Sequence, residues 1–171
     1  LDVKPKGEVI PKTAEEFAAL LNSHLSEIDD GYDDAILGNA MEKLEFECFS
    51  DNVENSLTKN VVGMGAIPKY VGDRLNSFKS EYEKLYALIR NCNLVIHEMK
   101  ETDTEMAKAC YATAYTLRGV AYYNLMRLFC EPYNKQKADE QLGLSIVTRF
   151  DMEARPKRSS LQEIVSLIEE D

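Results

Sequence analysis

Residues 112–133 read ATAYTLRGVAYYNLMRLFCEPY, and with the residues just before them they place apolar side chains on two flanks of a helix. The first apolar stripe consists of Ala107, Cys110, Ala114, Leu117, Ala121, Leu125 and Leu128. The second stripe consists of Tyr111, Tyr115, Tyr122, Met126 and Phe129, with Arg118 in its midst. A helix that only covers a core needs one stripe, so two stripes require helices packed on both sides. The pattern therefore predicts an all-α fold built from stacked helical hairpins.

Another helix is predicted shortly before this one. Its apolar residues recur at alternating intervals of four and three, the spacing of a seam between nearly antiparallel helices: Phe78, Tyr82, Leu85, Ile89, Cys92, Ile96 and Met99. Thr102 and Glu105 follow with the spacing of a capping box, and Pro132 ends the second helix. So short a connection predicts a hairpin of two helices, each roughly 35 Å long at about 1.5 Å per residue.

Further helices are predicted on either side of the hairpin. The sequences TAEE at residues 13–16 and SLQE at 160–163 each have the spacing of a capping box that opens a helix. The last helix reaches Asp171 without a terminator, so we expect residues 1–171 to form a single helical domain that is truncated at its carboxy-terminal end. Residues 37–48 fit a shorter helix, although part of this segment also alternates like a strand.

The charge balance excludes one class of partner. The 171 residues include 30 acidic and 20 basic side chains, which gives a formal net charge of −10. Nucleic-acid binding requires clustered basic residues, and the nearest cluster is Arg155, Lys157 and Arg158 in a proline-containing loop. We therefore predict no nucleic-acid partner. No run approaches the roughly 18 apolar residues of a membrane span, so no transmembrane helix is predicted either.

No metal or cofactor is predicted. The four cysteines, Cys48, Cys92, Cys110 and Cys130, lie far apart and form no CxxC or Cys/His spacing. We interpret them as small buried side chains, with a disulfide or a reactive thiol as the alternative. The acidic run at residues 29–34 lacks the order of an EF-hand, so a helix end followed by a cap is favoured over calcium.

The two histidines give no catalytic pattern. His24 and His97 each lie in a predicted helix near apolar neighbours, and nothing fixes a nucleophile beside either ring. We therefore interpret both as structural or surface residues and predict no enzymatic activity.

Arg118 has two interpretations. Among tyrosines it could stack on rings and bind a ligand carboxylate or sulfate. We favour a structural role, in which it pairs with an internal acid or a tyrosine hydroxyl and fixes the register of packed helices. Structural roles are also assigned to Asn93, Tyr115 and Tyr122.

Residues 50–74 form the longest irregular stretch and are the predicted place for ligand contacts. They offer hydrogen-bond donors and acceptors together with one aromatic ring, a mixture suited to a sugar: Asp51, Asn52, Tyr70, Asp73 and Arg74. The alternative is a solvated connector, because the stretch also contains Gly63, Gly65 and Gly72.

Five segments, in order, resemble motifs of the SusD/RagB family of nutrient-binding outer-membrane lipoproteins. The residues LDV, with Pro5 and Gly7, resemble the family's start, and SDNV at 50–53 resembles its "SD" loop. Tyr86, Ile89 and Asn93 match its YxxIxxxN motif. Residues 117–129 resemble its LRAxxYxxLxxxFG motif, and residues 158–171 resemble its RxSvxEvyxxIxxDL motif. Gly119 replaces the usual Ala, Cys130 the usual Gly, and Val165 an aromatic residue. The chain contains no Trp, which leaves only Tyr and Phe to stack on a sugar ring.

The resemblance implies a fold and a function. It implies a tetratricopeptide-like helical scaffold in a non-enzymatic receptor, held at the cell surface by a lipid anchor that lies outside this chain. Such a receptor hands a glycan or another nutrient to a SusC-like TonB-dependent outer-membrane transporter. A helical-repeat adaptor that binds a protein or peptide remains the alternative, and a helical enzyme domain is a weaker third hypothesis.

Overall fold

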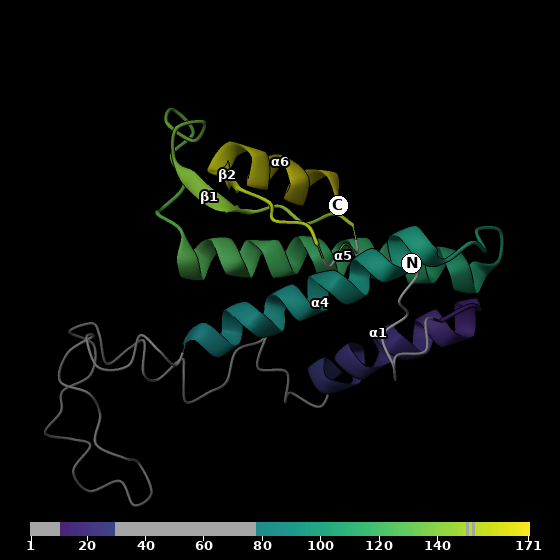
Figure 1. Cartoon of the computed structure of the whole chain (residues 1–171). Coiled ribbons are helices and arrows are strands. Elements are labelled where there is room, and N and C mark those ends of the chain that lie inside the picture. The colour runs from purple at the N-terminus through teal and green to yellow at the C-terminus, as the bar shows by residue number, and fades with distance from the viewer. Residues whose placement is uncertain (1–10, 30–77, 150, 152) are drawn as a thin grey trace, which may run out of the picture.

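The computed structural model describes residues 11–29, 78–149, 151 and 153–171 (Figure 1). The element order is α1 Ala14–Asp29, α4 Phe78–Glu98, α5 Glu105–Phe129, β1 Leu142–Ser145, β2 Arg158–Ser160 and α6 Leu161–Glu170. Helices dominate this part of the chain, which confirms the predicted all-α class. The predicted short helix or strand at residues 37–48 lies outside the described residues.

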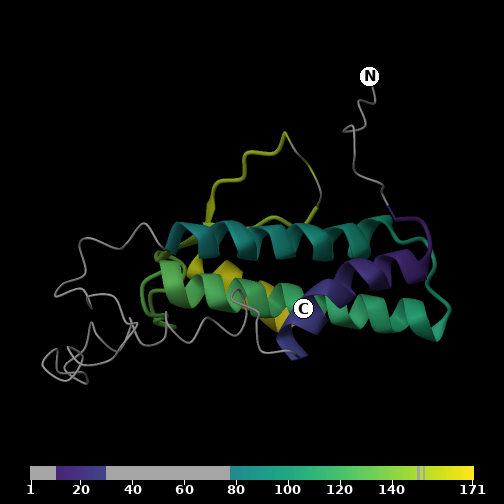
Figure 2. The same ribbon diagram turned by 90° about the horizontal axis from the view of Figure 1, so that it is seen from below.

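Helices α4 and α5 form the predicted hairpin. They contain 21 and 25 residues and lie side by side along most of their length (Figure 2). At about 1.5 Å per residue they are roughly 32 and 38 Å long. Small side chains of α5 are fully buried in the core, among them Ala107, Ala114 and Ala121. Leu85 and Ile89 of α4 are buried in the same core.

Helix α5 lies between other elements on more than one side, which explains its two apolar stripes. It packs against α4, α1 and α6, and it also contacts β1 (Figures 1 and 2). Phe17 and Leu21 of α1 are buried in the same core as Ile164 of α6. The prediction that α5 is sandwiched between helices is therefore confirmed.

Two of the three predicted capping boxes are confirmed. In the first, Thr13 Oγ1 accepts from Glu16 N at 3.3 Å, and Glu16 Oε2 accepts from Thr13 N at 3.4 Å. The second, at the start of α6, joins Ser160 and Glu163 in the same reciprocal way. Each box satisfies amides that have no partner inside the first turn of a helix.

The capping box predicted for Thr102 and Glu105 is wrong. The N-cap of α5 is Thr104, whose Oγ1 accepts from Ala107 N at 3.2 Å. Glu105 is then the first residue of the helix, and the hydroxyl of Thr104 donates to Glu101 at 2.8 Å. Two threonines stand near this helix start, and the spacing of sequence letters does not distinguish which hydroxyl lies beside the free amides.

The antiparallel pair of β1 and β2 is a feature that the sequence patterns did not predict. The strands have four and three residues and pair Leu142 with Ser160 and Ser145 with Arg158. Strands this short show no usable period. Gly143 permits their close approach, because a Cβ there would lie 2.9 Å from the carbonyl oxygens of both Ser159 and Ser160.

Candidate functional site

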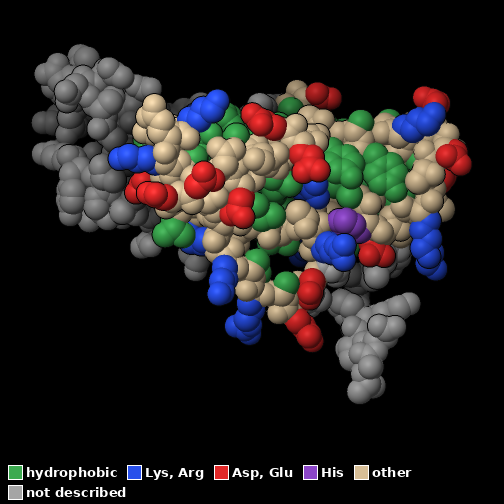
Figure 3. Space-filling model, turned by 90° about the horizontal axis from the view of Figure 1, so that it is seen from above, with side chains coloured by type: hydrophobic (Ala, Val, Ile, Leu, Met, Phe, Trp, Pro, Cys, Tyr) green, Lys and Arg blue, Asp and Glu red, His purple; other side chains and the backbone are tan. Residues whose placement is uncertain are grey.

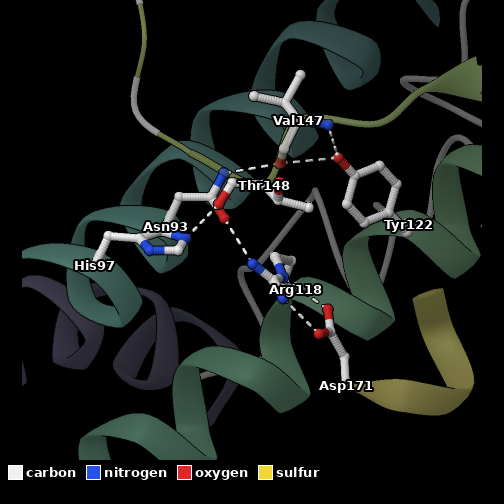
Figure 4. Close-up of polar contacts among 7 residues, drawn as sticks. All are labelled: Asn93, His97, Arg118, Tyr122, Val147, Thr148 and Asp171. Carbon is white, nitrogen blue, oxygen red and sulfur yellow. Dashed lines mark hydrogen bonds and ion pairs between the residues drawn. The ribbon is translucent and has the colours of Figure 1, made fainter.

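We call residues 145–148, which run from the last residue of β1 into the segment that follows it, the strap. Side chains of the hairpin hold its backbone (Figure 4). Asn93 Nδ2 donates to the carbonyl oxygen of Val147 at 2.8 Å. The Tyr122 hydroxyl donates to the same carbonyl at 3.1 Å and accepts from the amide of Val147 at 2.7 Å. One residue of the strap is therefore bonded at both of its backbone groups, by side chains from both helices.

Two further side chains of α4 hold the neighbouring strap residues. The Tyr86 hydroxyl donates to the carbonyl of Ser145 at 2.8 Å, and His97 Nε2 lies 2.5 Å from the carbonyl of Thr148. A carbonyl oxygen can only accept, so Nε2 of His97 carries the proton. Tyr86, Asn93 and His97 are separated by seven and four residues, an interval that places them on one face of α4.

Arg118 joins this face to the end of α6. Its Nε donates to Asp171 Oδ2 at 2.6 Å, and its Nη2 donates to Asp171 Oδ1 at 2.5 Å. Its Nη1 donates to Asn93 Oδ1 at 2.9 Å, so the Asn93 amide connects Arg118 to the strap. The ring of Tyr115 lies 5.2 Å from the guanidinium carbon. We call Asn93, Arg118, Tyr122 and Asp171 the polar network.

The charged pair of the polar network is almost fully shielded from water. The side chains of Arg118 and Asp171 are 6% and 1% exposed. Burial by itself lowers the pKa of Arg118, but the hydrogen bond and the charge of Asp171 raise it by more, so the net pKa is raised. The guanidinium therefore remains charged beside its carboxylate.

The hydroxyl groups that hold the strap stay protonated. Burial raises the pKa of Tyr122 to about 12, against smaller opposing effects from the Val147 backbone and Arg118. Burial also raises the pKa of Tyr86. Both groups thus retain the proton that they donate to the strap.

The described cysteines are free thiols. Cys92 and Cys110 are buried, which confirms the interpretation as small core side chains, and Cys130 is half-buried. Burial raises the pKa of Cys92 to about 12. That environment disfavours the thiolate, the reactive form. Cys48 lies outside the described residues.

The predicted site residues fall into two groups, of which the structure describes one. Those assigned structural roles come together, since Asn93, Arg118 and Tyr122 form one network with Tyr115 against the guanidinium. Those assigned to ligand contacts all lie outside the described residues: Asp51, Asn52, Tyr70, Asp73 and Arg74.

The sequence patterns did not reveal two contributors. Asp171 is 53 residues from Arg118, and no local spacing joins them. His97 was seen only as a helical histidine, although its distance of four residues from Asn93 places it on the strap-binding face. The strap itself gives no signal, because it is held through backbone groups that every residue carries.

The polar network is chemically saturated. No buried side-chain nitrogen or oxygen in the described part of the chain lacks a hydrogen-bond partner. His24, the other histidine, accepts from Asn91 at 3.1 Å and so joins α1 to α4. Within residues 11–29, 78–149, 151 and 153–171, no three His, Cys, Asp or Glu side chains are grouped to hold a metal ion. These bonds join α1 to α4, and α4 and α5 to α6 and the strap.

Comparison with protein families gives a match that covers residues 1–171. The family is SusD-like, described as starch-binding and associating with the outer membrane. No curated protein matches the chain in sequence. None of the described helices is long and apolar enough to cross a membrane. Because the family match spans the whole chain and agrees with the motif resemblance, the protein belongs to the SusD-like family of starch-binding proteins that associate with the outer membrane.

Proposed function

We propose that this protein is a non-enzymatic, lipid-anchored receptor at the cell surface that binds a glycan and delivers it to a SusC-like TonB-dependent outer-membrane transporter. The observation that carries the proposal is the SusD-like family match over residues 1–171. In this proposal the chain supplies the tetratricopeptide-like scaffold of a longer receptor.

The polar network supports a scaffold role for the hairpin. Its hydrogen-bonding groups face the strap and the end of α6, and a ligand would have to compete for them with groups of the same chain. Within a single chain that competition is intramolecular and strongly favours the strap. Glycan contacts are therefore proposed on residues 50–74, with Tyr70 stacking on a sugar ring and Arg74 donating to its hydroxyls.

The same observation disfavours the alternative of a peptide-binding adaptor. An adaptor of this type binds an extended or helical segment against its hairpins. On the α4–α5 hairpin that position is already taken by the strap, which is held at Ser145, Val147 and Thr148. A peptide partner would need to displace it.

Binding of the full-length receptor to a panel of polysaccharides, with starch included, tests the proposal. We expect saturable binding to at least one glycan, and a roughly tenfold loss of affinity in Tyr70→Ala and in Arg74→Ala, which is about 1.4 kcal/mol. Tyr123→Ala and Arg127→Ala are matched controls, because these exposed residues pair on the outer face of α5. Unchanged affinity in both loop variants would refute the assignment to residues 50–74, and no glycan binding at all would refute the receptor proposal.

A further inference from the structure

Helix α6 is attached to the rest of the described structure at both of its ends. At its start, Ser160 belongs to β2, which pairs with β1 and so with the first residue of the strap. At its end, Asp171 bonds to Arg118 of α5. The helix between these points has 10 residues, about 15 Å at 1.5 Å per residue. The sheet, α6, the polar network and the strap therefore form a closed ring of contacts.

A single side-chain amide closes this ring between the end of α6 and the strap. Figure 4 shows Asn93 in contact with both Arg118 and the strap. Its Oδ1 accepts from Arg118 Nη1, and its Nδ2 donates to the carbonyl of Val147. An arginine side chain only donates and a carbonyl only accepts, so one orientation of the amide satisfies both neighbours. A half-turn of the amide would place donor against donor and acceptor against acceptor.

Arg118 fixes this orientation only while it is itself held by Asp171. Two of its nitrogens donate to that carboxylate and a third donates to Asn93. Without the carboxylate, a buried guanidinium would lack its counter-charge and would turn toward water. Figure 3, viewed from the side of α6, shows acidic and basic side chains spread over the surface. The buried pair differs from these charges, because salt screens it much less.

We infer that the polar network couples the end of α6 to the strap, so that loosening one loosens the other. Asp171 holds Arg118 in place. Arg118 orients the Asn93 amide, and the amide holds Val147. Coupling between two sites is reciprocal, so a molecule that displaces either element would also loosen the other. The ring is therefore a conformational device within the scaffold, and the inference does not depend on the proposed function.

Hydrogen exchange in the full-length protein tests the coupling, with the Val147 amide as the reporter of the strap. Asp171→Asn keeps the shape of the side chain, but an amide can accept only one of the two bonds from Arg118. We expect the Val147 amide to exchange about tenfold faster in this variant at low urea, where local opening is observed. The acceleration should be similar at low and high salt. Glu170→Gln removes an exposed charge from the neighbouring residue and should leave the rate unchanged.

Two further variants test the reverse direction and the route. Tyr122→Phe loosens the strap directly and should accelerate exchange of the Asp171 amide, which donates to the carbonyl of Leu167 at 3.1 Å. Asn93→Leu removes the shared amide, and in that background Asp171→Asn should no longer change exchange at Val147.

A double-mutant cycle of Asp171→Asn and Tyr122→Phe, measured by urea unfolding, requires no change at Asn93. We expect the two changes together to raise the unfolding constant about threefold less than the product of their separate effects, because coupled sites do not combine independently. Independent effects would overturn the inference, as would unchanged exchange at Val147 in Asp171→Asn or an equal acceleration in Glu170→Gln. An acceleration that persists in the Asn93→Leu background would assign the coupling to β1 and β2 and overturn the role given to the amide.

Discussion

The guanidinium of Arg118 and the carboxylate of Asp171 form a two-point ion pair that joins the middle of α5 to the residue that follows α6. Both side chains are nearly inaccessible to water, and Asn93 takes a third N–H of the arginine. The pair therefore joins the carboxy-terminal end of α6 to the hairpin. In the receptor proposed above, this pair would hold α6 at a fixed place on the hairpin scaffold.

Removing one partner of this pair should destabilise the protein strongly. Arg118→Met leaves the Asp171 carboxylate buried without its counter-charge, and we expect a loss of about 3–5 kcal/mol in the free energy of unfolding. Urea denaturation gives the value. The double variant Arg118→Met/Asp171→Leu should recover a large part of the loss, because it buries two apolar groups in place of one unpaired charge. A single variant within about 0.5 kcal/mol of the wild type would contradict a structural role for the pair.

The bond between Tyr122 and the strap gives a second prediction. Tyr122→Phe removes the hydroxyl that bonds to both the carbonyl and the amide of Val147. We expect a loss of about 1–3 kcal/mol, since buried groups lose a partner. Hydrogen exchange at the Val147 amide should also accelerate. Tyr123→Phe, on the exposed side of the same helix, serves as the control and should change stability by less than about 0.5 kcal/mol.

Helical periodicity predicted α4, α5 and their pairing because burial on a helix repeats every three or four residues. The stripes did not predict the strap. Its contacts depend on backbone groups of Ser145, Val147 and Thr148, which have no signature in the side-chain pattern. The sequence predicts an internal acid as a partner of Arg118 but does not show which acid it is. Arg118 and Asp171 are 53 residues apart, so no local spacing in the sequence joins them. The five motif-like segments identified the family when taken together, although each segment alone is a weak signal.

The raised pKa of Tyr122 predicts a loss of stability at high pH. The pKa is about 12 in the folded protein and 10.0 in the reference state, so the protonated form is favoured by folding. This contribution is complete below pH 10 and is lost as the pH rises from 10 through 12. Two pKa units correspond to roughly 2.7 kcal/mol. Because Phe does not ionise, the stability advantage of the wild type over Tyr122→Phe should shrink across this window, and an advantage that stays constant to pH 12 would contradict the raised pKa.

Two glycines should respond to alanine in opposite directions. Gly119 lies inside α5, where an added Cβ would meet Asp171 Cβ at 3.5 Å and the carbonyl of Ile168 at 3.6 Å, both ordinary contacts. Gly119→Ala should therefore stabilise the protein by about 1 kcal/mol through helix propensity. At Gly143 the added Cβ would lie 2.9 Å from two carbonyl oxygens, so Gly143→Ala should push β1 away from β2 and destabilise the protein by roughly 1–3 kcal/mol. Thermal unfolding of the two variants side by side measures both effects. A stabilising Gly143→Ala would show that β1 and β2 are not held at the close approach described.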